Sequence, residues 1–185
     1  ATSDPFTIEI DATAPVITLN GSAAISVELG GVYTELGATA DTGETVVIDN
    51  SAVNTSLVGL YEVTYNATDS FGNVANEVIR EVTVVDTVIP EILISDQTFE
   101  ATIFGGTNIP LEFPEIIDIQ NTELTNDAPE IFPLGETIVT WTATDSSGNS
   151  ASATQTITVV DTTSPVLIAP EDLIIEAEST LTQIE

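Results

Sequence analysis

Short segments in which apolar and polar residues alternate recur along the chain, separated by Gly, Asn, Asp and Pro. In residues 61–68 the odd positions are apolar or aromatic and the even positions are polar, and residues 139–144 repeat this alternation. A period of two is typical of strands with one buried face. No segment has apolar residues at helical spacing, so the pattern predicts an all-β protein. Further strands are expected at 15–20, 23–29, 45–49, 91–95, 98–103, 110–113 and 123–125.

The two alternating segments lead into similar turn sequences, Asp-Ser-Phe-Gly-Asn at 69–73 and Asp-Ser-Ser-Gly-Asn at 145–149. Asp and Asn side chains bond to nearby backbone in turns, and Gly supplies a positive φ. Each turn is therefore predicted to close a hairpin whose second strand ends near Val84 or Val159.

The second strand of the first hairpin has one residue more than its counterpart, because 86 − 69 = 17 whereas 161 − 145 = 16. Strict alternation back from Val82 would place Arg80 on the apolar face. We expect a β-bulge near 76–80 that turns Arg80 outward.

A pattern that runs from Asp to Pro occurs three times at a fixed spacing. It starts at Asp11, Asp86 and Asp161, and 86 − 11 = 161 − 86 = 75. Regular recurrence indicates a tandem array, and many short strands per 75 residues predict immunoglobulin-like β-sandwiches in a linear array. We expect the end of a preceding repeat and its linker at 1–11, Ig-like repeats at 12–86 and 87–161, and the start of a truncated third repeat at 162–185.

Strand-like segments near both ends, Phe6–Ile10, Val166–Ile168 and Leu173–Ile175, have no domain of their own. Isolated strands are not stable in water. We expect the chain to be an excerpt of a larger ordered assembly, in preference to end strands that pair with neighbouring copies.

Charge restricts the partners and the chemistry. The chain has 30 acidic residues and one basic residue, for a net charge of −29, and 42% hydrophobic residues suffice for a core. Such a charge repels nucleic acid and anionic membranes and attracts cations, and no apolar run is long enough to span a membrane. The chain has no His, Cys or Lys, so Ser-His, Cys-His and Schiff-base catalysis are excluded, and we expect no enzyme activity.

The segments Val82-Thr-Val-Val-Asp-Thr-Val-Ile-Pro90 and Phe132-Pro-Leu-Gly-Glu-Thr-Ile-Val-Thr-Trp141 resemble a hyalin (HYR) repeat, over all of 87–161. Residues 12–86 resemble the related bacterial and archaeal Ig-like surface repeats, through Pro15–Gly21, Gly59–Tyr65 and Thr68–Asn73. The resemblance implies sandwiches arrayed in adhesins, surface-layer proteins or spacers of secreted enzymes. Animal hyalin repeats usually carry paired cysteines, and their absence here favours a prokaryotic source.

Acidic residues are expected to gather where one repeat meets the next, because the loops at that end of an Ig-like sandwich lie beside its entry point. Calcium prefers six to eight oxygen ligands. An EF-hand is excluded, since the position of its bidentate Glu is occupied by Arg80 or Thr156. The alternative is that the Asp residues only cap turns. The predicted calcium ligands are Asp11, Asp41, Glu44, Asp69 and Asn73 at one junction, Asp86, Asp118, Asp145 and Asn149 at the next, and Asp161 at a third, incomplete one.

Sequons for N-glycosylation occur at Asn20, Asn54 and Asn66, of which Asn66 lies on the outward parity. Tyr65 and Trp141 lie on the apolar parity and are expected in the core, not on a sugar-binding platform.

The sequence thus favours a structural segment of a large, prokaryotic, extracellular cell-surface protein, such as a surface layer or a filament or adhesin stalk. The expected partners are neighbouring repeats, other copies in a surface assembly, and cations. The alternatives are a ligand- or carbohydrate-binding adhesin module and a spacer of a secreted hydrolase.

Overall fold

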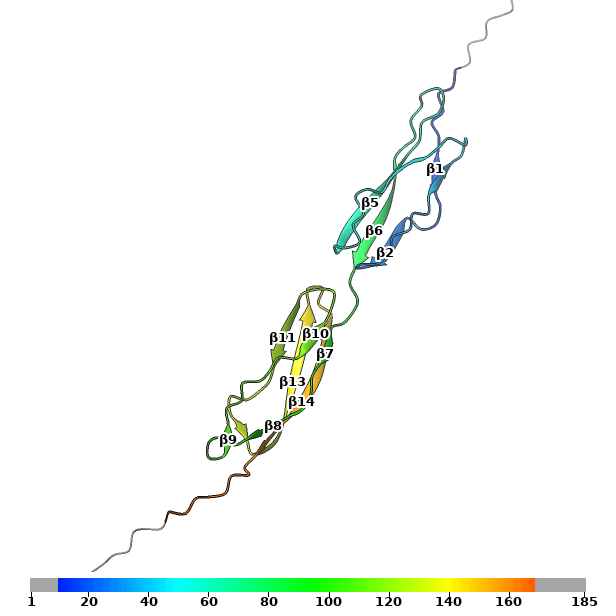
Figure 1. Ribbon diagram of the computed structural model, residues 1–185. Coiled ribbons are helices and arrows are strands. Elements are labelled where there is room, and N and C mark those ends of the chain that lie inside the picture. Colours follow the sequence, from blue (N-terminus) through cyan, green and yellow to red (C-terminus); the bar gives the residue numbers. More distant parts are fainter. Residues whose placement is uncertain (1–9, 169–185) are drawn as a thin grey trace, which may run out of the picture. The chain divides into compact units, whose positions relative to one another are not determined.

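Two long hairpins organise the fold, as Figure 1 shows for the computed structural model, which describes residues 10–168. In the first, β5 (Gly59–Asn66) pairs antiparallel with β6 (Val78–Val85). At the edges, β2 (Ala24–Glu28) adds parallel to β6, and β4 (Val47–Asp49) adds antiparallel to β5. The resulting sheet has the order β2-β6-β5-β4. A separate two-stranded sheet is formed by β1 (Ile17–Leu19) and β3 (Ala38–Ala40).

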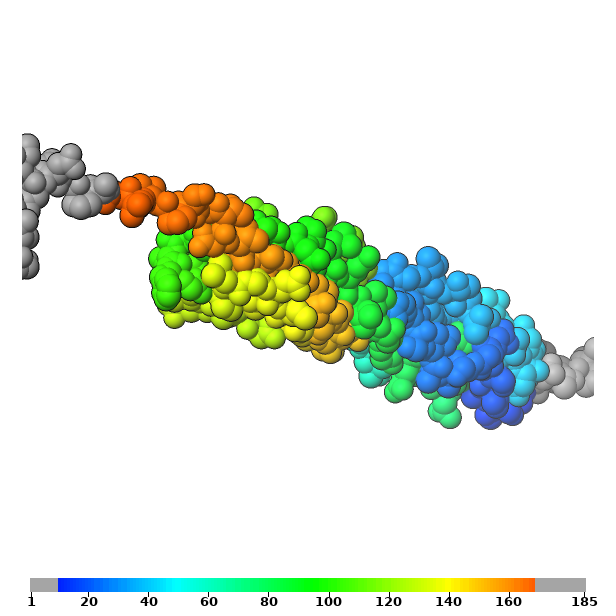
Figure 2. Space-filling model, turned by 90° about the horizontal axis from the view of Figure 1, so that it is seen from below, coloured from blue at the N-terminus to red at the C-terminus, as the bar shows by residue number. Residues whose placement is uncertain are grey.

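The second hairpin consists of β13 (Gly135–Asp145) and β14 (Ser150–Val160), visible as neighbouring yellow and orange stretches in Figure 2. Its sheet is completed by β8 (Gln97–Glu100), parallel to β14, and by β11 (Thr122–Asn126), antiparallel to β13. Two-stranded sheets are formed by β7 (Glu91–Leu93) with β10 (Glu115–Ile117), and by β9 (Gly106–Thr107) with β12 (Phe132–Pro133).

Both four-stranded sheets have the same topology. The order β8-β14-β13-β11 matches β2-β6-β5-β4, with a parallel strand, β8 or β2, at the same edge. The strand that precedes this edge strand in the chain, β7 or β1, belongs to a small antiparallel sheet. The duplication of strand order agrees with the internal repeat in the sequence. The all-β prediction is confirmed for the described residues, which contain no helix that could span a membrane.

By proximity of backbone, the described chain divides into two compact units. The first holds the described residues up to Ile94 with Phe113–Asp127 and Thr140–Thr154, and the second holds Ser95–Glu112, Ala128–Val139 and the described residues from Gln155 onward. The repeat limits at 86 and 161 stay a prediction.

The alternation of β5 places its odd residues in a core. Val63 and Tyr65 are fully buried, and they form one cluster with Ile17 of β1 and Val82 of β6. Burying a side chain of this size contributes about 1.5–3 kcal/mol, so the long hairpin anchors the first sheet.

The same alternation buries Val139, Trp141 and Ala143 on β13. Trp141 is 1% exposed, and its ring meets that of Phe113 edge-on, with centroids 5.9 Å apart. Tyr65 and Trp141 are therefore core residues, as predicted, and neither offers a platform for a sugar.

The two hairpin turns have the predicted form. The amide of Asp69 donates to the carbonyl of Asn73 (3.1 Å), and the amide of Asp145 donates to that of Asn149 (2.9 Å). Gly148 has a φ of 92°, a backbone conformation that other residues rarely adopt.

The prediction that Arg80 points outward is wrong. Tyr65 faces Val78 and Thr68 faces Val74, so the three steps from Tyr65 to Thr68 lie opposite the four steps from Val74 to Val78. The extra residue therefore lies before β6. From Val78 the ladder is regular, and Arg80 is fully buried. Burial of this charge is compensated by an ion pair and by backbone carbonyls: Arg80 donates to Glu35 Oε1 (2.6 Å), to the carbonyl of Asn20 (2.6 Å) and to that of Ser22 (3.0 Å).

The strand expected at 110–113 is absent, and the chain is irregular there. Pro110 begins this segment and Pro114 follows it; proline has no N–H for a ladder and restricts the residue before it. The short strands β3, β9, β10 and β12 had not been predicted.

Most of Phe6–Ile10 and all of Leu173–Ile175 lie outside the described residues. Val166–Ile168 is described, and it forms no strand and is exposed.

Candidate metal centre

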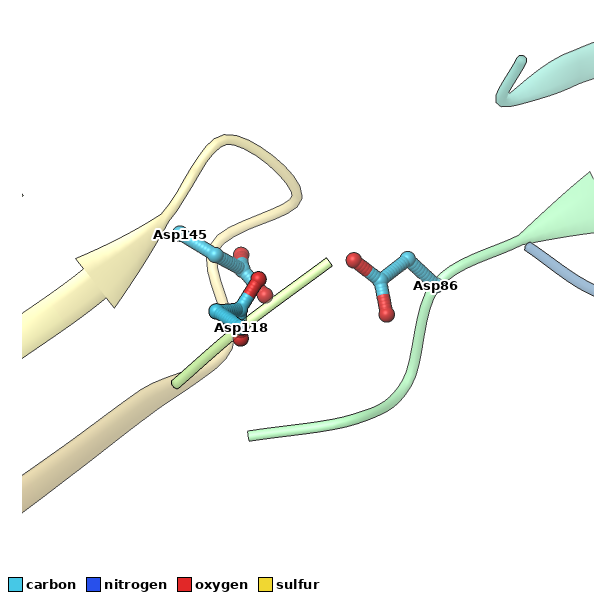
Figure 3. A group of neighbouring side chains, drawn as sticks. All are labelled: Asp86, Asp118 and Asp145. Carbon is cyan, nitrogen blue, oxygen red and sulfur yellow. The ribbon is translucent and has the colours of Figure 1, made fainter. Parts of the chain in front are cut away.

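Three acidic side chains from separate segments converge at the start of the connection that follows β6 (Figure 3). Asp86 comes directly after β6, Asp118 directly after β10, and Asp145 is the last residue of β13. Each contributes a carboxylate oxygen, and the three oxygens lie within 4.8 Å of one another. Among residues 10–168, this is the one group of three or more potential ligand side chains at such separations.

The hairpin turn after β13 fixes the position of Asp145. Its Oδ1 accepts hydrogen bonds from the amides of Ser147 and Asn149 (both 2.8 Å), and its Oδ2 accepts one from Asn149 Nδ2 (2.8 Å). The same Nδ2 donates to the carbonyl of Asp86 (3.0 Å). Asn149 therefore links the turn to the backbone of the connection.

Asp86 and Asp118 each use only one carboxylate oxygen within the protein. Oδ1 of Asp86 accepts from the amide of Val88 (3.1 Å), and Oδ1 of Asp118 accepts from the amide of Gln120 (2.6 Å). Both Oδ2 atoms are buried without a hydrogen-bond partner, and Asp86 as a whole is only 7% exposed. Buried carboxylate oxygens are normally paired, because leaving them unpaired is costly.

The electrostatics of the group follow from burial and crowding. Burial raises the pKa of the Asp86 carboxyl, and the negative charges of Asp145, Asp118 and Glu28 raise it further. Burial acts in the same direction on Asp145, but hydrogen bonds from Asn149 and the turn amides outweigh it, so the pKa of Asp145 is lowered. The charged form of the carboxylate is therefore destabilised at Asp86 and stabilised at Asp145.

This donor set fits a hard cation. Calcium binds oxygen ligands at about 2.3–2.6 Å, so two ligands on opposite sides of one ion are about 5 Å apart. Oxygens within 4.8 Å of one another are compatible with that geometry. The group contains neither of the soft or borderline donors, Cys and His, that zinc and copper prefer.

The first predicted junction is not assembled in the same way. Asn73 Nδ2 donates to Asp69 Oδ2 (2.7 Å) and to the carbonyl of Asp11 (3.2 Å), as Asn149 does at its junction. Asp41, however, uses Oδ1 to accept from the amide of Val16 (2.8 Å), and Glu44 accepts from the hydroxyl of Thr42. Asp11, Asp41 and Asp69 do not form a group of three close carboxylates like the one at Asp86 in the described part of the chain.

Asp161, predicted to begin a third site, is exposed and accepts from the amide of Thr163 (3.2 Å).

The three sequons lie in different settings. The side-chain nitrogens of Asn20 and Asn66 donate to the carbonyl of Leu36 (3.1 Å) and to Glu77 Oε2 (3.0 Å). Asn54 is exposed, and its Oδ1 accepts from the amide of Ser56 (3.0 Å).

Two glutamates beside the junction aspartates had not been predicted as functional. Glu28 ends β2 and Glu100 ends β8, and each carboxylate accepts hydrogen bonds from the threonine that follows a junction Asp, Thr87 or Thr162. A shared sequence signal exists: both glutamates precede a Gly-Gly pair, at 30–31 and 105–106. The number of residues between the Glu and its Gly-Gly pair differs between the two repeats, so the correspondence of Glu28 and Glu100 is not evident from the sequence.

Family models match both halves of the chain. The model "Bacterial surface protein, Ig-like domain" matches residues 17–84, and the HYR domain model matches residues 85–159. Residues 17–84 belong to the first of these Ig-like repeat families, and residues 85–159 belong to the second. The resemblance noted in the sequence and the Ig-like fold class are thereby confirmed.

Relatives of this Ig-like chain include two sea-urchin proteins. It is 36% identical to hyalin of Strongylocentrotus purpuratus over 91% of its length, and 36% identical to hyalin of Lytechinus variegatus over 90%. The chain spans 16% and 35% of the lengths of these two relatives.

Among solved structures, the alignment with the human mucin-like protocadherin EC1-2 covers 78% of the Ig-like chain and 98% of the protocadherin chain, at 16% identity and a TM-score of 0.34. A TM-score this low does not establish a shared arrangement.

Family membership settles the broad class of the protein. HYR and Ig-like domains are surface modules of the adhesion type, and the chain is not an enzyme. The families place it among extracellular surface proteins.

Proposed function

We propose that the chain is a structural repeat segment of a large extracellular cell-surface protein, and that calcium held by Asp86, Asp118 and Asp145 stiffens the connection after β6. The observation that carries the proposal is the pair of buried, unpartnered oxygens on Asp86 and Asp118, next to a third carboxylate.

A cation resolves two costs at once. It supplies a partner for each orphaned oxygen, and it offsets the repulsion among three carboxylates. Protonation of Asp86 would relieve only part of the repulsion. With a net charge of −29, the chain also attracts cations to its surface before any of them binds.

The setting we favour is a prokaryotic surface layer, filament or adhesin stalk, in which neighbouring repeats and other copies are the partners. It is supported by the bacterial-surface description of the first family and by the absence of cysteine. In such a protein, Asn20, Asn54 and Asn66 are candidate glycan sites. The full-length gene tests this setting: a catalytic domain beside the repeats would instead make them a spacer of a hydrolase.

Calcium titration of the 185-residue chain tests the metal site. Extracellular calcium modules bind with a Kd of about 10⁻⁴–10⁻³ M, and calcium at 100 times Kd would stabilise the fold by about 2.7 kcal/mol. We expect calorimetric titration to show binding, and the melting temperature to rise with calcium and fall back in chelator. Asp145→Asn should abolish the rise, whereas Asp69→Asn, the same position of the other hairpin turn, should retain it.

Asp86→Asn provides a test of opposite sign. Because the pKa of Asp86 is raised, its charge opposes folding when no cation is present. The variant should therefore melt at or above the wild-type temperature in chelator and lose the response to calcium. Equal melting temperatures of the wild type in calcium and chelator, with no bound metal by elemental analysis, would reject the site. Small-angle scattering then tests stiffening: an unchanged maximum dimension on chelation would show that a bound ion does not rigidify the chain.

A further inference from the structure

Glu28 binds the residue that follows Asp86 through both of its carboxylate oxygens. Oε1 accepts from the amide of Thr87 (2.7 Å), and Oε2 accepts from its hydroxyl (2.9 Å). The next residue, Leu29, donates its amide to the carbonyl of Val85 (2.7 Å). The residues on both sides of Asp86 are therefore held by the end of β2.

The same arrangement recurs at the end of the second sheet. Glu100 accepts from the amide and the hydroxyl of Thr162 (2.6 and 2.9 Å), and Ala101 donates to the carbonyl of Val160 (2.7 Å). The parallel registers explain the recurrence, since Glu28 lies opposite Val85 and Glu100 opposite Val160. We call this pairing of a strand-end Glu with the Thr after a junction Asp the Glu–Thr clamp.

The two clamps differ in what lies beside them. At the Glu28 clamp, Asp86 has an unpartnered oxygen and lies in one group with Asp118 and Asp145, and its carbonyl is bonded to Asn149. At the Glu100 clamp, Asp161 is exposed and belongs to no such group among the described residues.

We infer that Glu28 is a positioning residue of the cation site, which acts through Thr87 to hold the backbone of Asp86 in place for binding. The inference rests on the proposed function of Asp86, Asp118 and Asp145. Hydrogen bonds at Thr87 on one side and from Asn149 on the other hold the main chain of Asp86, which fixes the point from which its carboxylate extends toward the other two. Residues that orient metal ligands typically affect affinity by about 10–100-fold.

Four variants of the 185-residue chain test the inference. Glu28→Gln leaves only one acceptor for Thr87, and Thr87→Val removes its hydroxyl while the charge of Glu28 stays. The matched controls are Glu100→Gln and Thr162→Val, which alter the other clamp in the same way. Calcium affinity is measured by calorimetric titration, and the melting temperature is measured in chelator.

We expect Glu28→Gln to weaken calcium binding about tenfold and Thr87→Val to weaken it measurably, while both controls keep the wild-type affinity. The melting temperature in chelator should change similarly for Thr87→Val and Thr162→Val, because each loses one hydroxyl hydrogen bond. For Glu100→Gln it should change at least as much as for Glu28→Gln, because Glu100 also accepts from the hydroxyl of Thr163 (3.1 Å). A purely structural clamp would move the melting temperature and leave the affinity alone.

The outcomes separate this inference from the proposal on which it depends. If the wild type binds no calcium, the cation site itself is rejected. If the wild type binds and Glu28→Gln equals Glu100→Gln, the site stands and the positioning role is overturned. If Glu28→Gln weakens binding and Thr87→Val does not, Glu28 acts through its charge alone, which also overturns positioning through Thr87.

Discussion

At the scale of single residues, the least expected feature is the place of the only basic side chain. Arg80 is buried in the first sheet, although 30 acidic residues could pair with it at the surface. Its partner Glu35 also accepts a hydrogen bond from the hydroxyl of Tyr65 (2.6 Å), and the guanidinium lies 5.4 Å from the centroid of the Tyr65 ring. The first sheet thus has a buried charged residue, Arg80, at the position where the second sheet has the buried neutral Gln155. The side-chain nitrogen of Gln155 donates to the carbonyl of Ser95 (2.8 Å).

Replacing Arg80 by Gln should destabilise the chain strongly. Removal of one member of a buried ion pair usually costs about 3–5 kcal/mol, and here the partly buried carboxylate of Glu35 would lose its counter-ion. Urea unfolding monitored by circular dichroism measures the loss. The double variant Arg80→Gln with Glu35→Gln should recover a large part of it, and losses that simply add would show that the pair is not coupled.

The pH dependence of this pair has a defined sign. Burial by itself raises the pKa of Glu35, but hydrogen bonds from Tyr33, Tyr65 and Gly37 and the charge of Arg80 lower it overall. A lowered pKa in the folded state stabilises the fold above the ordinary value near 4.5, and that contribution is lost as the pH falls below it. Wild type and Glu35→Gln should therefore converge in stability under acid conditions.

At the scale of elements, sequence reasoning succeeded where strands are long. β5 and β13 are eight and eleven residues long, and the alternation over 61–68 and 139–144 covers enough of each to make the period of two unambiguous. β9 and β12 have two residues each and show no period. The strand predicted at 110–113 does not form because two prolines prevent a ladder, a local effect that the alternation of Leu111, Glu112 and Phe113 does not reveal.

The candidate site was predictable only in part, for a related reason. Asp86 and Asp145 stand at repeated positions, so their proximity follows from the duplicated topology. Asp41 is predicted as a ligand at the first junction, as Asp118 is at the second, but the carboxylate of Asp41 bonds to the amide of Val16, a contact 25 residues away that no local pattern encodes. The inward side chain of Arg80 depends in the same way on Glu35, 45 residues earlier.

The hairpin turns should require glycine for backbone reasons alone. Gly148 has a φ of 92°, and an added Cβ would meet no atom within 4 Å. Gly148→Ala should thus cost about 1–2 kcal/mol of strain without a clash, measured by the urea midpoint. Gly148→Asn should cost less, since Asn tolerates this region better. Gly59→Ala, at a strand position with no positive φ, should not be destabilising to this extent, and an equal loss there would contradict the explanation.

At the scale of the whole molecule, the net charge of −29 acts on every part of the chain. Repulsion among like charges destabilises a compact state, and salt screens it, with a Debye length of about 10 Å at 0.1 M and about 3 Å at 1 M. Any cation therefore stabilises the protein to some degree. A calcium effect is specific only if it exceeds screening at the same ionic strength.

Melting curves at matched ionic strength separate the two effects. An increase in NaCl from about 0.02 to about 0.5 M should raise the melting temperature of the wild type and of Asp86→Asn by similar amounts, because both keep nearly the same total charge. About 2 mM CaCl2, compared with about 6 mM NaCl of equal ionic strength, should raise it for the wild type alone. If calcium stabilised both proteins equally, its action would be general screening of the acidic surface, and the three carboxylates at Asp86, Asp118 and Asp145 would not form a binding site.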